Sequence, residues 1–423
     1  MRRWLLLLAG VALFGGAPHA QTPQENPAGV ITLEDAVRVA LLQSPELRAF
    51  AAGRRSAEAR QLASTWRPNP AAGLLVEDLG ASQRDGVQPQ ITLQVSHVLE
   101  LGQKRAARLA VANQDRALAD VDYEAARLLV LSRVGEEFRQ VLADQAAAEH
   151  AARAVALAQE VHRAVQARVE AGVASPIEAT RSELLVISAE RDETAAGHAL
   201  IASRTRLASL WGGADPRFER AAGDLTVMPE MPPLEALDAQ AATAPSVLRW
   251  TVAVERRRAE LAQVRASAVP DLTMHVGYRR HTTTGGQGVI VGGTIDLPLF
   301  GRPKDSQAAA TADIARAEAD ADVVRREVRA ALHSAAASLA AARASATALR
   351  DRAVPAARSV FEAVREGYSL GRFSLMDVLD AQRALAGTER DHLDALVAFH
   401  AAVAAIERLT GHPLPSPGAR QVP

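Results

Sequence analysis

Hydrophobic and polar residues alternate with a period of two in three short segments of this chain. Such alternation is typical of β-strands with one apolar and one polar face. The apolar positions are Ile91, Leu93 and Val95 in the first segment, Leu272, Met274, Val276 and Tyr278 in the second, and Val289, Val291, Ile295 and Leu297 in the third. A fourth, less regular segment lies around 74–79, and Asp85-Gly86 and Gly285-Gly286 supply turn residues. The pattern therefore predicts two β-hairpins.

Much of the remaining chain consists of long segments that are rich in alanine and contain no proline. Residues 104–170 and 304–354 are two of these segments. A helix over the first would be roughly 100 Å long, at about 1.5 Å per residue. Each long helix is expected to stop near a glycine, Gly172 or Gly371, where a partner helix returns antiparallel.

The sequence repeats itself after about 200 residues. Gly172-Val173-Ala174-Ser175 and Gly371-Arg372-Phe373-Ser374 stand 199 residues apart, and matches near the two strand ends keep the same offset. Helices are expected over 33–65 and 234–268, each before a proline-containing break. An internal repeat of this kind indicates two copies of one structural unit.

Each copy consists of a helix, two strands, a long helix, a turn and a returning helix. The first repeat occupies residues 21–212 and the second occupies residues 234–411. A linker rich in proline and glycine, residues 213–233, joins them. Residues 412–423 are expected to form a disordered tail.

The N-terminus has the order of a secretory signal peptide. Basic residues Arg2 and Arg3 come first, an apolar run of limited length follows, and Ala20 closes the segment. We therefore expect export, with residues 1–20 removed. Beyond this segment no run of about 18 apolar residues occurs, so no helical membrane span is expected.

Composition and motifs argue against several classes of function. The formal net charge is −1 and there is no cysteine, so neither nucleic-acid binding nor a cysteine-based metal site is expected. Among the 11 histidines no metal-ligand motif is found, and the chain has no nucleophile elbow or phosphate loop. We expect neither an enzyme nor a cofactor. His97 and His275 are placed on polar strand faces and interpreted as solvated lumen residues rather than metal ligands.

Four strands cannot form a membrane barrel alone, because the smallest such barrels have eight strands and open edges are costly in lipid. Three copies of the chain would supply twelve strands. The predicted fold class is therefore mainly α with a small β part. In it, an internally duplicated chain forms an outer-membrane β-barrel and a long α-helical barrel that trimerisation completes.

From Ile31 to Gly411 the sequence resembles the TolC-type outer-membrane factors, the outer membrane efflux protein family. The motifs that carry this resemblance are Leu33-Glu34-Asp35-Ala36, Leu99-Glu100-Leu101-Gly102-Gln103-Lys104-Arg105, Ile295-Asp296-Leu297-Pro298-Leu299-Phe300 and Asp377-Val378-Leu379-Asp380-Ala381-Gln382-Arg383. The second and third, with Pro68-Asn69-Pro70, are most similar to the CzcC-type branch that serves heavy-metal cation pumps. The resemblance implies a channel subunit of a tripartite efflux system that spans the outer membrane and extends into the periplasm.

The resemblance also implies roles for residues near the two turns. Asp377 and Asp380 match acids that line the family's entrance constriction, and Tyr368 and Glu178 match positions that help to hold the entrance closed. Helix-start acids that complement the helix dipole remain the alternative for the aspartates.

The turns themselves match the tips that dock onto a periplasmic adaptor protein in this family. The tip residues are Arg168, Gly172, Val173 and Ser175 in the first repeat and Gly371 and Ser374 in the second. Val173 stands where leucine is usual, and Gly367 where the first tip has its arginine. A plain role as turn and helix-cap residues is compatible with docking.

The expected partners are two more copies of the chain, a periplasmic adaptor, an inner-membrane transporter of the RND type and outer-membrane lipid. Two alternatives stay open at this point. One is an outer-membrane channel for drug efflux or type I protein secretion, which shares the architecture. The other is a soluble periplasmic coiled-coil adaptor, which would not explain four alternating strands.

Overall fold

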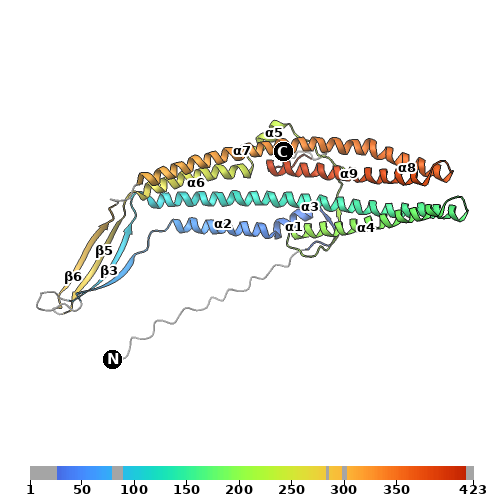
Figure 1. The fold of residues 1–423 in the computed structure, drawn as a ribbon. Helices are drawn as coiled ribbons and strands as arrows, with labels where there is room; N and C mark the ends of the chain where they lie inside the picture. The colour runs from blue at the N-terminus through green and yellow to red at the C-terminus, as the bar shows by residue number, and fades with distance from the viewer. Residues whose placement is uncertain (1–25, 79–88, 283–284, 298–302, 416–423) are drawn as a thin grey trace, which may run out of the picture.

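The computed structural model describes residues 26–78, 89–282, 285–297 and 303–415. The protein is a long, narrow molecule with a β-sheet at one end and two helical hairpin tips at the other (Figure 1). The signal peptide expected over 1–20 and the turn expected at Asp85-Gly86 lie outside the described residues. No helix in the described ranges is long and apolar enough to cross a membrane.

The two repeats contain the same series of elements, except that a π-helical turn divides the long helix of the second. In the first these are β1 (Gly29–Thr32), α1 (Leu33–Gln43), α2 (Pro45–Ser64), β2 (Ala71–Glu77), β3 (Gln90–Leu99), α3 (Lys104–Glu170) and α4 (Pro176–Ser209). After β4 (Phe218–Ala222) the second repeat has α5 (Leu234–Ala242), α6 (Pro245–Ser267), β5 (Leu272–His281), β6 (Gln287–Ile295), α7 (Pro303–Ala348), a π-helical turn η2 (Leu349–Ala353), α8 (Val354–Ser369) and α9 (Leu375–Thr410).

Four strands form one antiparallel sheet in the order β2-β3-β5-β6. The two hairpins are therefore joined through β3 and β5, whose register pairs Leu93 with Tyr278 and Val95 with Val276. Within the described residues β2 and β6 have no partner on their outer edges. The sheet thus brings the two repeats together and leaves two edges open.

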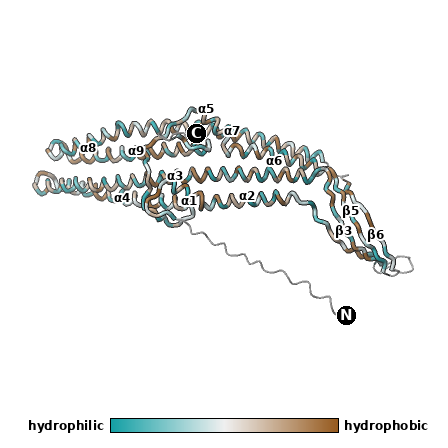
Figure 2. The backbone as a smooth tube through the Cα atoms, turned by 180° about the vertical axis from the view of Figure 1, so that it is seen from behind, coloured by the Kyte–Doolittle hydropathy of each residue, from teal (hydrophilic) through white to brown (hydrophobic). Residues whose placement is uncertain are grey.

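One face of this sheet is apolar and exposed. Leu74 on β2, Leu93 on β3, Val276 on β5 and Val291 on β6 share this face and are all exposed. The opposite face carries Thr92, Gln94 and Ser96 of β3 and the residues opposite them on β5. Figure 2 shows hydrophobic and hydrophilic positions interleaved along the strands and the helices.

The expectation for one of the two strand histidines is wrong. His97 pairs with Met274 and has the same parity as Val95, so it belongs to the apolar face. His275 pairs with Ser96 and does lie on the polar face, where its ring covers Gly292. Side chains alternate strictly between the two faces of a sheet along each strand. The position of a residue in the strand, and not its polarity, therefore decides on which face of the sheet it lies.

The helices pack side by side along the molecule, with α3 in contact with α2, α4, α6 and α9. Buried positions on α3 recur every three or four residues, as in Val130, Val134, Phe138 and Val141. This spacing places one stripe of small and branched side chains against the neighbouring helices, as in a coiled coil.

The helices expected over 33–65 and 234–268 are each broken near a proline. Ser44 caps α2 at Pro45, and α5 ends before Pro245 in the second repeat. Proline is tolerated in the first turn of a helix but not in its interior. Each expected helix is therefore two helices.

The middle of the molecule contains a second, parallel sheet that the sequence did not predict. β1 pairs with β4, and β4 lies inside the segment expected to be only a linker, 213–233. Buried Gln145 of α3 completes this sheet, since its amide donates to the carbonyl of Ala221 at 3.0 Å and its oxygen accepts from the Ala221 amide at 2.7 Å.

The C-terminal tail begins later than expected. Leu414 is buried against the cluster that contains Leu237, Leu332 and Phe399, and its amide donates to the Glu407 carboxylate at 3.0 Å. Leu414 is therefore part of the core of the second repeat, while His412, Pro413 and Pro415 are exposed.

The two long helices differ at one place. α3 runs without interruption for 67 residues. Its counterpart in the second repeat, from Pro303 to Ser369, has the same total length but contains the π-helical turn η2 before Pro355. The position of Pro355 accounts for this turn, because proline cannot donate the usual backbone hydrogen bond and clashes with the preceding turn of an α-helix.

Candidate channel entrance and the sheet–helix junction

Both hairpin tips are glycine turns followed by a serine-capped helix. Gly172 and Gly371 have φ angles of +72° and +73°, in the left-handed region that favours glycine. Ser175 accepts from the Ile177 amide at 3.3 Å and so caps α4. Ser374 caps α9 in the same way, by accepting from the amide of Asp377. The predicted tip residues thus have clear local roles as turn and cap residues.

Both tips expose large apolar side chains. Val173 and Ile177 at the first tip and Leu370 and Phe373 at the second are all exposed to solvent. Large apolar side chains gathered at the end of a long hairpin are unusual on a free surface and are typical of a contact site.

Arg168 lies inward, away from this exposed surface. Its Nη1 donates to the backbone carbonyl of Tyr368 at 2.6 Å, and its guanidinium stacks on the Tyr368 ring at 4.6 Å from the centroid. Tyr368 is 6 % exposed. The residue assigned to the docking tip by resemblance is therefore held between the two hairpins.

Tyr368 also meets the other residue expected at the entrance closure. Its hydroxyl donates to Oε2 of Glu178 at 3.3 Å. Burial, and next the charge of Glu178, raise the pKa of Tyr368, so the phenol stays protonated and can donate at physiological pH. The structure thus brings Arg168, Tyr368 and Glu178 into one network that ties α3 and α4 to α8.

Gly367 stands where the first tip has Arg168, and Phe373 occupies the space beside it. The Phe373 ring lies so close to the Gly367 Cα that a Cβ there would collide with the ring. The second tip therefore replaces the arginine contact with an aromatic ring packed on glycine.

Asp377 is bound within its own helix start. Its Oδ2 accepts from the Ser374 amide at 2.8 Å and from the Ser374 hydroxyl at 2.7 Å. These bonds lower the pKa of Asp377, which is fully exposed and therefore ionised at neutral pH. Asp377 thus lies in the first turn of α9, as the helix-dipole alternative expects, and also closes a capping box with Ser374.

Asp380 also has a partner, one that the sequence-based reasoning did not consider. Nη1 of Arg383 lies 3.3 Å from Oδ1 of Asp380. The two residues stand three apart on α9, a spacing that places side chains on the same helix face. The Asp-x-x-Arg spacing in Asp380-Ala381-Gln382-Arg383 was the signal that could have revealed the pair.

At the other end of the helices, a group of residues joins the sheet to the helical part. Gly102 has a φ of +67°, and a Cβ there would lie 2.6 Å from the Val269 Cβ. Asp271, which precedes β5, accepts from the Leu101 amide at 3.0 Å and pairs with Lys104 at 2.7 Å. These contacts fix β3 and α3 of the first repeat against α6 and β5 of the second.

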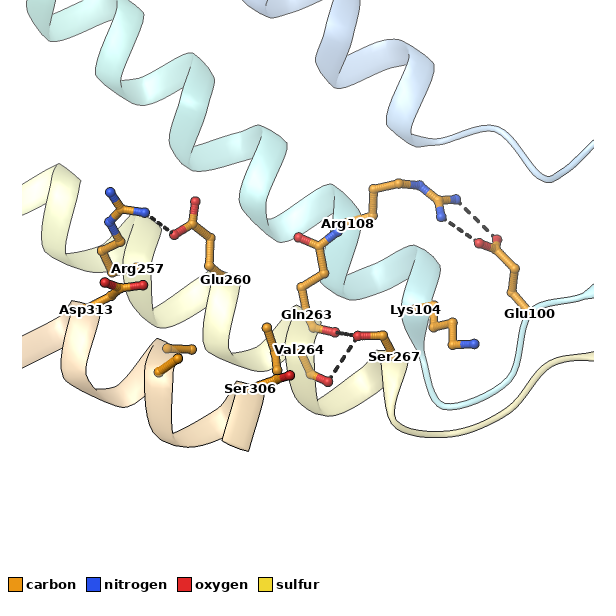
Figure 3. A pocket seen from close by; sticks show the side chains of 12 residues that line it. Glu100, Lys104, Arg108, Arg257, Glu260, Gln263, Val264, Ser267, Ser306 and Asp313 are labelled. Carbon is orange, nitrogen blue, oxygen red and sulfur yellow. Dashed lines mark hydrogen bonds and ion pairs between the residues drawn. The ribbon is translucent and has the colours of Figure 1, made fainter. Parts of the chain in front are cut away.

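Arg108 completes the junction. It forms a two-pronged ion pair with Glu100, at 2.5 and 3.1 Å, and its Nη2 donates to the carbonyl of Trp66 beyond α2. Figure 3 shows Arg108, Glu100 and Lys104 beside Arg257 and Glu260 of α6, around a cavity of about 630 Å³. The motif around Gly102 noted in the sequence thus forms the link between sheet and helices.

In the part of the chain that the structure describes, no three histidine, aspartate or glutamate side chains are grouped so that they could hold a metal ion. The polar sheet face carries instead an internal contact in which Arg279 donates to the Thr92 hydroxyl at 3.1 Å and approaches Glu77 at 3.4 Å.

Comparison with known proteins agrees with this architecture. A family model described as outer membrane efflux protein matches residues 36–213 and 236–412. The cobalt-zinc-cadmium resistance protein CzcC of Cupriavidus metallidurans is 32 % identical over 384 residues, which cover 91 % of each chain. The nickel-cobalt-cadmium resistance protein NccC of Alcaligenes xylosoxydans xylosoxydans is 29 % identical over 346 residues, 78 % of this chain and 75 % of the relative.

Solved structures show the same fold at lower sequence identity. CusC superimposes with a TM-score of 0.77 at 16 % identity over 90 % of this chain and 92 % of its own. The outer membrane protein VceC of Vibrio cholerae gives 0.74 at 17 % identity over 90 % and 96 %. The chain therefore belongs to the outer membrane efflux protein family and is a channel component of a tripartite efflux system, located in the outer membrane and extending into the periplasm, rather than an enzyme.

Proposed function

We propose that this protein is a homotrimeric outer-membrane channel that carries heavy-metal cations out of the periplasm, together with a periplasmic adaptor and an inner-membrane RND transporter. The four-stranded sheet is the feature that supports a trimeric assembly. Within the described residues the sheet has one exposed apolar face and two edges, β2 and β6, that have no partner strand. Unpaired backbone groups are costly in lipid, so further copies of the chain are needed to pair those edges in a closed barrel.

The curated relatives support heavy-metal cations as the exported cargo. The names of CzcC and NccC link them to resistance against cobalt, zinc, cadmium and nickel. Acidic residues near the hairpin tips support the same cargo, because rings of carboxylates in a narrow aqueous opening favour cations.

The hairpin tips are the proposed contact with the adaptor. The exposed apolar residues Val173, Ile177, Leu370 and Phe373 form that surface, and the turns at Gly172 and Gly371 with the caps Ser175 and Ser374 hold it in shape. Arg168, Tyr368 and Glu178 form the proposed closure between the hairpins.

Deletion of the chain in its own host tests the cargo. We expect sensitivity to Co²⁺, Zn²⁺ or Cd²⁺ to rise while sensitivity to dyes and antibiotics stays unchanged, and the intact chain should restore tolerance. Increased antibiotic sensitivity alone, or loss of a secreted protein, would assign the channel to drug efflux or protein secretion instead. A stable monomer in detergent would contradict the proposed assembly.

Asp377 and Asp380 are the proposed entrance constriction, and their charges can be tested separately from the helix cap. Asp377→Asn with Asp380→Asn should lower the selectivity for cations over anions in planar bilayers and weaken block by divalent cations. Ser374→Ala is the matched control, because it removes the cap at a cost of about 1 kcal/mol without changing charge. An equal loss of selectivity in Ser374→Ala would show that the cap, and not the charge, is responsible.

A further inference from the structure

We infer that Arg383 is a specificity-determining residue of the entrance: a built-in counter-ion that neutralises Asp380 at rest and gives way to a divalent cation. This inference rests on the proposed function, since it concerns the same entrance. The proposed constriction would then contain the positively charged Arg383 in addition to Asp377 and Asp380.

The contact geometry supports a pair that forms readily and opens readily. The Arg383 and Asp380 side chains are 66 % and 68 % exposed, with 3.3 Å between Nη1 and Oδ1. Exposed pairs of this kind contribute little to stability and are weakened by salt. A divalent cation that reaches the carboxylate can therefore displace the guanidinium at little cost.

Asp377 cannot take over this role, because its carboxylate is bound to Ser374 through the backbone amide and the hydroxyl. Within the described residues, Asp380 is paired with the exposed side chain of Arg383 and takes no part in a helix cap. The charge that an approaching cation meets at Asp380 thus depends on where Arg383 lies.

A groove beside Arg383 can accommodate its side chain when it leaves Asp380. Arg383 lines a groove of about 590 Å³ between α4 and α9, together with Leu184, Met376 and Gln382. A guanidinium displaced from Asp380 remains beside this groove, whose lining also includes Arg181 and Asp192 of α4.

Comparison with the first repeat shows that a helical hairpin of this kind can fold without an ion pair at the positions of Asp380 and Arg383. At the offset of 199 residues, Asp380 and Arg383 correspond to Arg181 and Leu184. The α4 helix folds without an acid–base pair at these positions. The pair therefore belongs to the second hairpin, the one that carries the entrance acids.

Arg383→Gln tests the inference in purified channels in planar bilayers. We expect it to raise the cation-over-anion permeability ratio and to lower severalfold the Co²⁺ concentration that half-blocks the channel. In an Asp380→Asn background the same change should leave the Co²⁺ block unaltered. Arg325→Gln is the matched control, since Arg325 forms an exposed pair of the same spacing with Asp322 on α7; its selectivity should equal that of the unmodified channel.

Cysteine chemistry provides an independent version of this test, because the chain has no native cysteine. Arg383→Cys channels labelled with a cationic methanethiosulfonate should regain the original selectivity, whereas a neutral methyl label of the same thiol should not. This comparison uses the same assembled protein and is therefore independent of any folding effect of the substitution.

The possible failures are distinguishable. No change in selectivity or block in Arg383→Gln, or equal effects of the two labels, would overturn the role of Arg383 while the metal-export proposal stands. If Asp380→Asn also left the ion selectivity unchanged, the proposed constriction at Asp380 would be wrong. Failure of the unmodified protein to conduct would overturn the proposed channel function.

Discussion

Gly102→Ala is expected to prevent most of the chain from reaching its assembled form in the outer membrane. Alanine must adopt a φ of +67° there, and its Cβ would lie 2.6 Å from the Val269 Cβ and 2.9 Å from the Ala266 carbonyl oxygen. A left-handed conformation costs an L-residue about 1–2 kcal/mol, and overpacking adds about 1–3 kcal/mol. The measurement is the fraction of heat-stable oligomer extracted from the membrane.

Gly285→Ala is the control for backbone conformation alone. Gly285 has a φ of +69°, but nothing lies within 4 Å of an added Cβ. It should retain most of the oligomer, with a lower temperature of dissociation. Equal losses in the two variants would show that the contact with Val269 is not the cause, and normal assembly of Gly102→Ala would contradict the proposed tightness of the junction.

Arg168→Ala is expected to open the channel entrance. It removes a 2.6 Å hydrogen bond to the Tyr368 carbonyl and a cation–π contact at 4.6 Å. Losses of about 0.5–1.5 kcal/mol for the hydrogen bond and about 0.5–2 kcal/mol for the ring contact would together shift a closed–open equilibrium about tenfold or more. Single-channel conductance should rise, and cells should become permeable to large hydrophilic antibiotics.

Tyr368→Phe should give a smaller effect, because it removes only the bond to Glu178. Arg365→Ala is the matched control: Arg365 also joins α8 to α3, through Glu160 at 3.4 Å, but both side chains are exposed. Exposed pairs contribute little, so conductance should be unchanged. If Arg365→Ala opened the entrance as much as Arg168→Ala, the buried network would have no special role in closure.

Periodicity was sufficient to predict the broad architecture. Alternation located β3, β5 and β6, and the glycine and serine pairs located both tips, since these signals are local. The membership in the efflux family and the fold class were confirmed by the family match and the structural neighbours. Strand pairing across the repeats was not predictable in detail, because it depends on contacts between residues about 180 apart.

The features that sequence reasoning missed depend on distant partners or on strand phase. β1 and β4 are only four and five residues long, too short for a periodic signal, and buried Gln145 completes their sheet from another element. His97 was misplaced because its polarity was given more weight than its parity with Val95. The resemblance placed Arg168 at the docking tip, which stays a prediction; its contact with Tyr368 was not predictable, because it joins residues 200 apart in the sequence.

The π-helical turn before Pro355 has a consequence for symmetry. Three duplicated chains would place six similar hairpins around one axis, which is approximately six-fold by sequence. A π-helical turn contains one residue more than an α-helical turn. Because the two long helices have the same number of residues, each residue beyond η2 is rotated by about 100° around the helix axis relative to its counterpart in α3. In the proposed trimer the tube therefore loses its six-fold character below η2. The entrance of that trimer would have three-fold symmetry only, because Arg168 contacts Tyr368 whereas Gly367, at the matching position of the repeat, packs against Phe373.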